Sequence, residues 1–361
     1  MEELAGNPTA SAEAPSARAG KFTFNALLGR ILAGERLRAG ESELLLEEIL
    51  DGGGDPIVVG AILVAMRARG ETPEELVGFA RAMRSRMLRV PVAGAVTDTC
   101  GTGGDRLGTI NVSTGAALVV AACGVDVCKH GGRAASSKAG SADVLEELGV
   151  RIDSGPEGVA RSIAATRFGF AFAPLFHPAM ARVAPIRRAL GVPTAFNFLG
   201  PLINPAGALT QLVGVFDAGY HRAMAGVLAA LGSSRALVVT GYDGLDEVSI
   251  SGPTRALEMT SDGDSVEYRE LVINPEEYGI GLAGLDEVAG GDGAANAGML
   301  VEIVSGVDRG PRSDLVAINA GATLWVAGAA ANLGDGIEMA RESLRSGAPA
   351  LVLESLKSLP A

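Results

Sequence analysis

The stretch from Asp98 to Glu146 constrains the fold more than any other part of the chain. It reads DTCGTGGDRLGTINVSTGAALVVAACGVDVCKHGGRAASSKAGSADVLE, in which polar, glycine-rich clusters alternate with apolar segments. The apolar segments predict a strand over 96–99, a helix over 115–125 and a second strand over 125–128. Open α/β sheets bind ligands in the loops at such strand ends. The stretch therefore predicts an α/β domain whose loops surround a multiply charged phosphate ligand.

The first cluster follows the first predicted strand and contains Gly101, Gly103 and Gly104. Without side chains, successive backbone N–H groups can turn toward one point and form an anion-binding concavity. Asp105 is an acid beside this concavity, which fits if a cation or a sugar hydroxyl is also bound. The alternative is a tight turn without a ligand. The spacing is neither that of a GxxxxGK[ST] phosphate loop nor that of a dinucleotide-binding fingerprint.

The second cluster, Asn111–Thr114, directly precedes the predicted helix. The hydroxyl of Ser113 or Thr114 is expected to cap the free N–H groups at the helix start. The same helix end attracts phosphate through its dipole and its unpaired N–H groups. Capping without a ligand is the alternative interpretation.

Basic residues follow the second predicted strand, in the sequence Lys129-His130-Gly131-Gly132-Arg133. Lys129 supplies a compact cation, whereas Arg133 supplies a forked guanidinium. The two glycines between them allow the backbone to approach a ligand. His130 is a candidate donor or acid/base group, although a lone histidine is more often structural.

Two later segments add candidates for the same site. Arg187 and Arg188 lie in a segment rich in proline, and one of them suits bidentate pairing with a carboxylate. Asp246 and Glu247 follow a predicted strand over 236–240. Adjacent carboxylates suit Mg²⁺, which takes oxygen ligands and often bridges phosphates. The alternatives are a solvated helical arginine pair and ordinary surface charge.

Composition limits the classes of partner. The 361 residues carry a net charge of −12, which argues against a nucleic-acid-binding surface and requires the basic site to be a local pocket. Cys100, Cys123 and Cys128 lack metal-ligand spacing and predict reduced thiols in a cytoplasmic protein. We expect no signal peptide and no membrane span, because the most apolar segment, 316–333, contains Asn319 and glycines.

The rest of the chain divides into a tail, a helical part and an α/β part. Residues 1–20 are rich in Ala, Ser, Pro and Gly and are predicted to be disordered. Apolar periodicity predicts helices over 22–37, 41–50, 56–69 and 73–87, with Thr72 as an N-cap. A linker over 88–94 leads into alternating strands and helices from Ala95, which predict a mostly parallel sheet. Further strands are expected over 169–173, 209–216, 236–240 and 255–259, and a helix is expected over 313–333, where Trp325 belongs to the core.

Eight sequence motifs together resemble those of the anthranilate phosphoribosyltransferase family. They are GTGGD (101–105), NVST (111–114), KHG-R..SS (129–137), GSADVLE (140–146), FHPAM (176–180), APIRR (184–188), FNFLGPLINPA (196–206) and DGLDE (243–247). The resemblance runs from about Phe22 to near the C-terminus. The glycine and KHG motifs also occur in nucleoside phosphorylases, whereas the last two motifs are far more specific.

The resemblance implies a fold and an assembly. It implies a small, discontinuous, all-helical domain over 21–94, onto which part of 184–207 packs, and a large α/β phosphoribosyl-binding domain over 95–361. It also implies a homodimer formed through the helical region.

The resemblance implies transfer of the phosphoribosyl group of 5-phosphoribosyl 1-pyrophosphate (PRPP) to the amino group of anthranilate, in tryptophan biosynthesis. No covalent nucleophile is implied. Ser113 would bind one Mg²⁺, and Asp246 with Glu247 a second. Anthranilate would contact Gly101, His130, Gly132 and Arg187. PRPP would contact Gly101, Gly104, Asp105, Thr109, Asn111, Val112, Ser113, Thr114, Lys129, His130, Gly131, Gly132, Arg133, Ala134, Ala135, Ser136, Ser137 and Ser141.

One position departs from the family pattern. The family usually reads KHGNR, whereas this chain reads KHGGR, so that Gly132 replaces an asparagine that helps to hold anthranilate. Two other functions share some of these motifs: a pyrimidine nucleoside phosphorylase, which would need neither Mg²⁺ nor the DGLDE motif, and a non-catalytic relative that binds nucleic acid.

Overall fold

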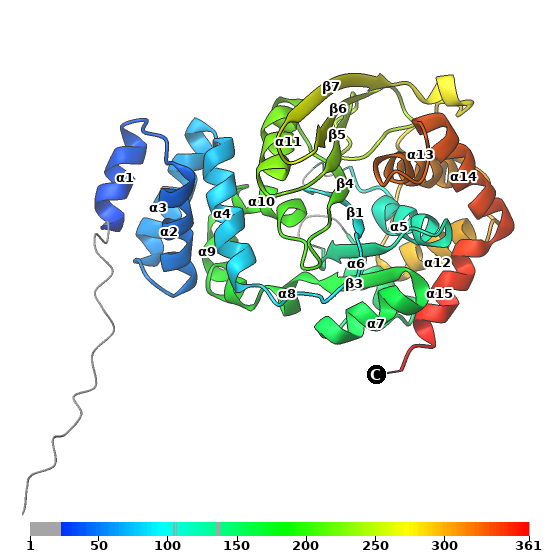
Figure 1. The fold of residues 1–361 in the computed structure, drawn as a ribbon, viewed down its shortest axis with the longest axis horizontal. Coiled ribbons are helices and arrows are strands. Elements are labelled where there is room, and N and C mark those ends of the chain that lie inside the picture. The colour runs from blue at the N-terminus through cyan, green and yellow to red at the C-terminus, as the bar shows by residue number, and fades with distance from the viewer. Residues whose placement is uncertain (1–22, 104, 106, 135–137, 361) are drawn as a thin grey trace, which may run out of the picture.

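The computed structural model describes residues 23–360 except 104, 106 and 135–137. The predicted disordered tail over 1–20 lies outside the described residues. Helices α1–α4 gather at one end of the molecule and α12–α15 at the opposite end, with a sheet between them (Figure 1). No helix in the described part of the chain is long and apolar enough to cross a membrane.

Four helices begin the described chain: α1 (Phe24–Leu32), α2 (Ala39–Leu50), α3 (Pro56–Arg69) and α4 (Pro73–Arg86). Their starts follow capping rules, since Asp55 caps α3 and Thr72 caps α4, each with proline at the first helical position. The first helix is shorter than the predicted 22–37. It ends before Gly34, whose φ of +87° lies in the left-handed region that glycine favours.

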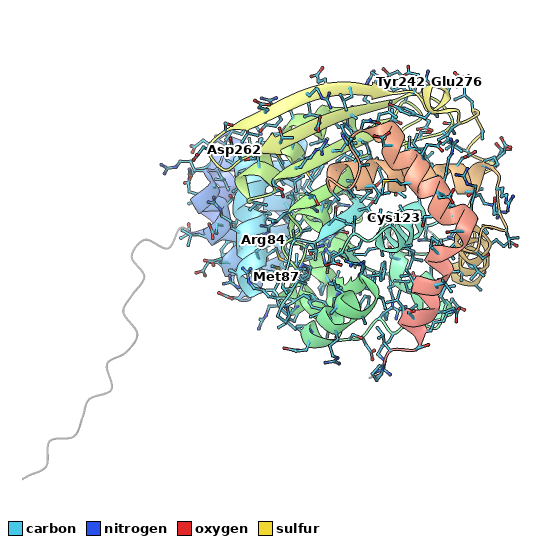
Figure 2. All side chains as sticks on the ribbon, turned by 45° about the vertical axis from the view of Figure 1, so that its right-hand side comes forward. Arg84, Met87, Cys123, Tyr242, Asp262 and Glu276 are labelled. Carbon is cyan, nitrogen blue, oxygen red and sulfur yellow. The ribbon has the colours of Figure 1, made fainter. Side chains whose placement is uncertain are left out.

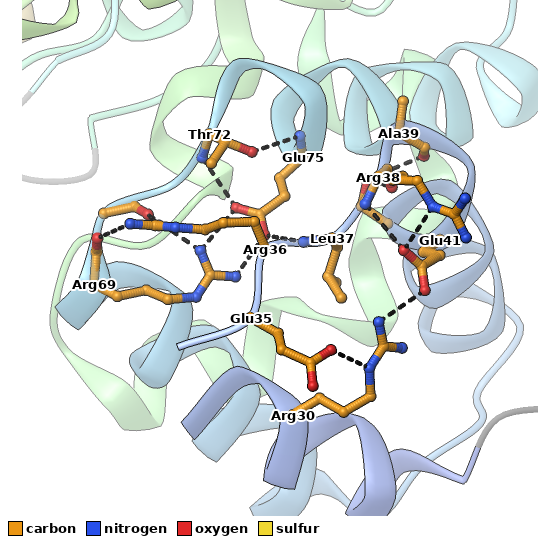
Figure 3. A network of polar contacts seen from close by, with 12 residues as sticks. Arg30, Glu35, Arg36, Leu37, Arg38, Ala39, Glu41, Arg69, Thr72 and Glu75 are labelled. Carbon is orange, nitrogen blue, oxygen red and sulfur yellow. Dashed lines mark hydrogen bonds and ion pairs between the residues drawn. The ribbon is translucent and has the colours of Figure 1, made fainter. Parts of the chain in front are cut away.

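The segment after α1 is held by a buried glutamate instead of by helical hydrogen bonds (Figure 3). Glu75 accepts the backbone N–H of Leu37 at 2.8 Å and the guanidinium of Arg69 at 2.5 Å. Burial opposes the charge of this side chain, but the hydrogen bonds outweigh burial and lower the pKa of Glu75. The Glu75 carboxylate therefore fixes the loop between α1 and α2 onto α4.

The sheet has seven strands in the order β3-β2-β1-β4-β5-β6-β7. The strands are β1 (Thr97–Gly101), β2 (Val127–Gly131), β3 (Phe168–Phe172), β4 (Thr210–Gly214), β5 (Arg235–Gly241), β6 (Thr254–Ser261) and β7 (Val266–Ile273). The first five are parallel, whereas β6 and β7 are antiparallel additions at one edge. The predicted mostly parallel α/β fold with a small helical domain is confirmed, and β7 is a strand that the prediction missed.

Helices cover both faces of the sheet. The helices of the α/β part are α5 (Val112–Ala122), α6 (Ser141–Glu147), α7 (Pro156–Thr166), α8 (Ala173–Phe176), α11 (His221–Ala230), α12 (Gly293–Val304), α13 (Pro311–Val326), α14 (Leu333–Ser346) and α15 (Ala348–Lys357). Alternate strand residues face opposite ways: Leu212 and Leu237 pack in the core with α5 and α13, whereas Val213 and Val238 pack with α11. The single helix predicted over 313–333 is wrong, because the chain turns at Gly328 (φ +76°) and restarts at the N-cap Asn332.

Two short helices from the middle of the chain join the N-terminal helices. These are α9 (Ala184–Leu190) and α10 (Phe196–Leu199), flanked by the 3₁₀ turns Pro178–Arg182 and Gly200–Leu202; further 3₁₀ turns span Ala218–Tyr220 and Pro275–Tyr278. The rings of Phe79 on α4 and Phe196 on α10 are 6.1 Å apart between centroids, within one core that continues to α11. Arg84 (Figure 2) ties α4 to the carbonyls of Leu202 and Leu231, at 2.7 and 2.9 Å. Helix α10 therefore packs on α4, while the predicted division of the chain into domains stays a prediction.

Candidate functional site

Gly101 and Asp246 meet at the ends of the central strands. Gly101 ends β1, and a Cβ atom there would lie 2.4 Å from Oδ2 of Asp246, so only glycine fits without displacing the carboxylate. The backbone N–H of Gly103 donates to the same oxygen at 2.8 Å. One N–H group of the glycine-rich cluster, which the sequence assigns to an anion, therefore binds a protein carboxylate in this structure.

Asp246 and Glu247 are buried, each with 8% of its surface exposed. Burial, reinforced by the neighbouring Asp105 carboxylate, raises the pKa of Asp246 to about 7. Burial and the charge of Asp246 also raise the pKa of Glu247 well above its ordinary value. Ionising both carboxylates is therefore costly unless a cation lies between or beside them.

Lys129 is the cation that the fold itself places beside these acids. It is 1% exposed, and its Nζ donates to the carbonyl of Thr99 at 2.9 Å and to Oγ of Ser113 at 3.0 Å. Its charge lowers the pKa of Glu247 and of Asp98, although burial still dominates both. Lys129 lies inside β2, not after it as predicted, because β2 runs from Val127 to Gly131.

The acids fit a divalent cation that is shared with a substrate. Among the described residues, no group of three or more His, Cys, Asp and Glu is arranged to hold a metal ion. Mg²⁺ commonly uses one or two carboxylates together with substrate phosphates and water, and does not need a cage made only of protein. The Asp246–Glu247 pair, with raised pKa values and one lysine nearby, matches that requirement.

The start of α5 differs from the prediction. The N-cap residue is Asn111, and Ser113 and Thr114 lie within the first turn, where neither caps the helix. The Asn111 side chain instead donates to the carbonyl of Ala139 at 3.2 Å and accepts from Asn296 at 2.7 Å. The buried hydroxyl of Thr114 has no hydrogen-bond partner in the described part of the chain. Of the two hydroxyls, only that of Ser113 lies beside Lys129 and faces the site.

His130 and His177 form a directed hydrogen-bonded pair. Nδ1 of His130 lies 3.0 Å from the carbonyl oxygen of Gly200, which can only accept, so His130 carries its proton on Nδ1. Its Nε2 is then an acceptor, and Nε2 of His177, at 3.0 Å, donates to it. Burial is the main cause that lowers the pKa of His130 to about 4 and of His177 to about 3. Both rings are neutral near pH 7.

Asp98 and Asn204 form buried hydrogen bonds that connect the strands beneath the site. Nδ2 of Asn204 donates to Oδ2 of Asp98 and to the carbonyl of Cys128, both at 2.8 Å. Asp98 also accepts the backbone N–H of His130 at 3.4 Å, and burial raises its pKa to about 6. The contacts join β1, β2 and the loop after α10, so they fix the strand ends that carry Lys129 and His130.

Arg133 is not directed toward the buried acids. Its guanidinium donates to Asp143 at 3.0 Å and to Glu146 at 2.9 Å, both on α6, and about half of its side chain is exposed. The backbone N–H of Ala134 donates to the other oxygen of Asp143 at 2.9 Å. Ser141 is the first residue of α6, with its Cβ 3.2 Å from the position that a Cβ on Gly131 would take.

Arg187 carries an unpaired charge. Its guanidinium lies 5.3 Å from the centroid of the Phe196 ring, no ion pair joins it to another described residue, and burial lowers its pKa. The neighbouring Arg188 is exposed. Gly132 has open space around it, since a Cβ there would meet no atom within 4 Å.

Of the remaining predicted site residues, some have a defined position in the structure and others lie outside its described part. Thr109 pairs with Ala289 in an isolated β-bridge, and Val112 is buried at the start of α5. Gly104, Ala135, Ser136 and Ser137 lie outside the described residues. The three cysteines are free, with Cys100 and Cys128 buried.

Three residues of the site were not predicted individually. Asp98 lies within the strand predicted over 96–99, His177 lies in the FHPAM motif and Asn204 in the FNFLGPLINPA motif. Asn204 in particular lies 106 residues from Asp98 along the chain. The motifs marked these segments, but only the fold shows which side chains meet.

Two family comparisons cover most of the chain. Residues 93–350 match the α/β domain of a glycosyl transferase family, and residues 25–87 match its helical bundle domain. Anthranilate phosphoribosyltransferase of Rubrobacter xylanophilus is 51% identical over 91% of this chain and 94% of its own. The corresponding protein of Desulfitobacterium hafniense is 46% identical over 87% of this chain and 92% of its own.

Solved structures agree with these relatives. The anthranilate phosphoribosyltransferase of Thermus thermophilus superposes with a TM-score of 0.86 at 43% identity, covering 92% of this chain and 98% of its own. The enzyme of Saccharomyces cerevisiae in complex with PRPP and Mg gives a TM-score of 0.83 at 28% identity, covering 93% and 98%. By its sequence along nearly its whole length and by its fold, the chain belongs to the anthranilate phosphoribosyltransferase family.

Proposed function

We propose that the protein transfers the phosphoribosyl group of PRPP to the amino group of anthranilate, which releases diphosphate in tryptophan biosynthesis. The observation that supports this most directly is that buried Lys129 of β2 lies close to two buried carboxylates of raised pKa, Asp246 and Glu247, on the loop after β5. A diphosphate with its divalent cation satisfies both sets of charges at once. Membership of the family supports the choice of donor and acceptor.

In this proposal the donor lies along the glycine cluster and the start of α5. The residues assigned to PRPP are Gly101, Gly104, Asp105, Thr109, Asn111–Thr114, Lys129–Ser137 and Ser141. The ammonium of Lys129 and the dipole at the start of α5 favour the negative phosphates. The N–H groups of Val112 and Thr114 donate to backbone carbonyls and that of Ser113 donates to Glu247, so they are available only if these contacts open. Arg133 is available to the donor only if it leaves its partners on α6.

Mg²⁺ is the cofactor that the donor set fits, and two ions are proposed. One would be held by Ser113, whose Oγ accepts from Lys129 and keeps a further lone pair. The other would be held by Asp246 and Glu247. When bound, Mg²⁺ neutralises charge on the departing diphosphate.

The acceptor is proposed to lie between Gly101, His130, Gly132 and Arg187. Arg187 would pair with the anthranilate carboxylate, because its guanidinium lies against the Phe196 ring and has no ion-pair partner in the described part of the chain. The amine nitrogen forms a bond to the anomeric carbon, the bond from that carbon to the diphosphate oxygen breaks, and the nitrogen loses a proton. The chain contributes orientation and electrostatic stabilisation, with no covalent nucleophile.

A direct assay tests this function. Anthranilate fluorescence should decrease only when the protein, PRPP and Mg²⁺ are all present. Phosphorolysis of a pyrimidine nucleoside without Mg²⁺ would instead favour a nucleoside phosphorylase, and binding of nucleic acid without turnover would favour a non-catalytic relative. If neither anthranilate nor PRPP is consumed in the presence of Mg²⁺, the proposal is contradicted.

A homodimer is proposed through the helical part of the molecule. A groove of about 700 Å³ between α3 and α9 is lined largely by apolar side chains, among them Ile57, which is 82% exposed. Small helical units often bury such a face against a copy of themselves. Light scattering should give twice the chain mass for the wild type and for Val307→Asp, a control at an exposed valine elsewhere. Ile57→Asp should weaken association, and a fully active wild-type monomer would contradict the dimer.

The cytoplasm is the proposed location. Its support is the three free cysteines, since a reducing compartment preserves thiols.

A further inference from the structure

A second charged recess lies on the α11 face of the sheet, near its antiparallel edge. It encloses about 660 Å³ and is lined by Gly219, His221, Arg222, Tyr242, Arg255 and Glu270, together with apolar residues of β6 and β7. We call it the Arg222–Arg255 recess. In the sheet register Arg255 stands opposite Thr240 and Val272, so its side chain emerges on the same face as theirs. Tyr242 lies at the outer surface of the molecule (Figure 2).

The two guanidinium groups of the recess lack acidic partners. Arg222 lies over the ring of Tyr268, 3.5 Å from its centroid, and Arg255 lies 4.6 Å from the centroid of Tyr242. Among the described residues, neither arginine forms an ion pair. The opposite face of the same strands differs, because Arg235 and Arg269 there both pair with Glu258. Stacking orients a guanidinium while its N–H edge stays free to donate.

His221 adds a buried polar group at the start of α11. The hydroxyl of Thr240 donates to the carbonyl of Val215 at 2.6 Å, so it must accept at 2.9 Å from Nε2–H of His221. Nδ1 of His221 then carries a lone pair with no hydrogen-bond partner among the described residues. Burial, and next the charge of Arg255, lower the pKa of His221 to about 4, against the weaker opposite effect of Asp217.

We propose that the Arg222–Arg255 recess binds the phosphate group of a small phosphate monoester. Two guanidinium groups can each donate to phosphate oxygens, and the start of α11 adds a favourable helix dipole. Glu270, the carboxylate among the described lining residues, is available to a hydroxyl or amino group on the rest of the ligand. The recess is built from α11, β6 and β7, whereas the donor site lies at the ends of β1, β2 and β4. The loop after β5 serves both, since it carries Tyr242 of the recess and the Asp246–Glu247 pair of the donor site.

The proposal does not depend on the function proposed above. The recess shares none of the residues assigned to PRPP or anthranilate, so a ligand there can be detected whether or not the protein turns those substrates over. The chain contains three histidines, which makes His221 a local reporter. Its imidazole C2–H signal can be assigned by its loss in His221→Asn.

The experiment is a titration of the full-length, Mg²⁺-free protein with inorganic phosphate at constant pH and ionic strength, followed by the histidine C2–H signals. The His221 signal should shift in a saturable way. Arg222→Gln and Arg255→Gln should each weaken the apparent affinity by about tenfold, the loss expected for one charge-assisted contact. Arg81→Gln, which removes an exposed arginine of α4, should leave it unchanged.

Two results would overturn the proposal. One is a His221 signal that does not saturate up to tens of millimolar phosphate. The other is an equal response in wild type, Arg222→Gln and Arg255→Gln. Phosphate that enters the donor site instead would shift the His130 signal and leave that of His221 unaffected, which also counts against the recess. Both arginines are exposed, so the two variants should fold, and circular dichroism checks this.

Discussion

Nε2 of His177 donates a hydrogen bond to Nε2 of His130 over 3.0 Å. The other ring nitrogen of His130 sets the direction of this bond: Nδ1–H donates to the carbonyl of Gly200, so Nε2 of His130 can only accept. Nδ1 of His177 is buried and forms no hydrogen bond of ordinary geometry among the described residues, although the nearby backbone of Ile203 raises its pKa against the larger effect of burial. His130 therefore offers no free proton at neutral pH, and its contact with a substrate must use the ring or the backbone unless this pair rearranges.

Replacing His177 with phenylalanine should show how much its hydrogen bond to His130 contributes to the stability of the fold. The ring volume is kept, but the buried Nε2 of His130 loses its partner, which should lower the free energy of unfolding by about 1–3 kcal/mol. Urea unfolding at pH 7.5 measures the change. A double-mutant cycle with His130→Phe supplies the control, because the second substitution should cost less once the first is made. Simple additivity would show that the two rings do not interact.

The same pair predicts a pH dependence of stability. The pKa values of His130 and His177, about 4 and about 3, lie below the ordinary value of about 6.5. The unfolded chain thus binds more protons, so the pair's contribution is present above pH 6.5 and is lost as the pH falls toward 4. Asp98, with its pKa raised to about 6, acts in the opposite sense over that range. Urea unfolding at pH 7 and pH 5 should show a larger loss in wild type than in the His130→Phe/His177→Phe variant, and equal losses would contradict this origin.

Arg187 should govern the acceptor more than the donor. Loss of a charge-assisted hydrogen bond costs roughly 1.5–3 kcal/mol, so Arg187→Ala should raise the KM for anthranilate by about one to two decades with little change for PRPP. Arg188→Ala is the matched control, because the adjacent guanidinium is exposed. A rise in the KM for PRPP alone would place Arg187 with the phosphates.

Gly132 should accept an asparagine. No atom lies within 4 Å of a Cβ at this position, and its φ lies outside the left-handed region, so the backbone and the Cβ of Gly132→Asn are accommodated without strain. One neutral hydrogen bond contributes about 0.5–1.5 kcal/mol. The KM for anthranilate should therefore fall a few-fold, with that for PRPP unchanged, in steady-state assays. If the wild type fails to use anthranilate but uses another aromatic amine, this position has altered the acceptor.

Removal of the Asp246 and Glu247 carboxylates should make thermal stability and turnover much less dependent on Mg²⁺. In the wild type, Mg²⁺ should raise the melting temperature at pH 8, where Asp246, with a pKa of about 7, must otherwise ionise beside Glu247. Asp246→Asn/Glu247→Gln should be folded, should lose most of the turnover and should show a much smaller Mg²⁺-induced shift in calorimetry. Asp286→Asn/Glu287→Gln, an adjacent acidic pair elsewhere, is the control. Unchanged activity of the first variant at limiting Mg²⁺ would end the assignment.

Local rules predicted those helices whose ends are set by their own residues. The helix over 56–69 was predicted with its observed limits, because Asp55, Pro56 and Gly70 define its start and its end. The first helix was predicted too long, because apolar periodicity continued through Leu37, which belongs to the core but reaches it from a loop held by Glu75. β7 was missed because it is an edge strand, mostly exposed, and its residues lack an apolar stripe.

For the candidate site, the sequence predicted which segments contribute residues, but it predicted few of the contacts between those residues. Lys129 and the Asp246–Glu247 pair were expected near one another because both follow or end strands of one sheet. The hydroxyls of Ser113 and Thr114 were expected to cap α5, but the helix begins one residue earlier than Ser113 and leaves them inside its first turn. The pairing of His130 with His177, 47 residues away, depends on the path of the chain after β3, which no local pattern encodes.

The packing of α10 against α4 also has a consequence for synthesis on the ribosome. Helices α1–α4 leave the exit tunnel first, yet their core includes Phe196, Phe198 and residues of α11. More than a hundred further residues must be translated before that core can close, and until then those of its apolar side chains that pack on the later segments remain exposed to water or to a chaperone. Because of the order of translation, helices α1–α4 can complete their packing only after α10 and α11 have been synthesised.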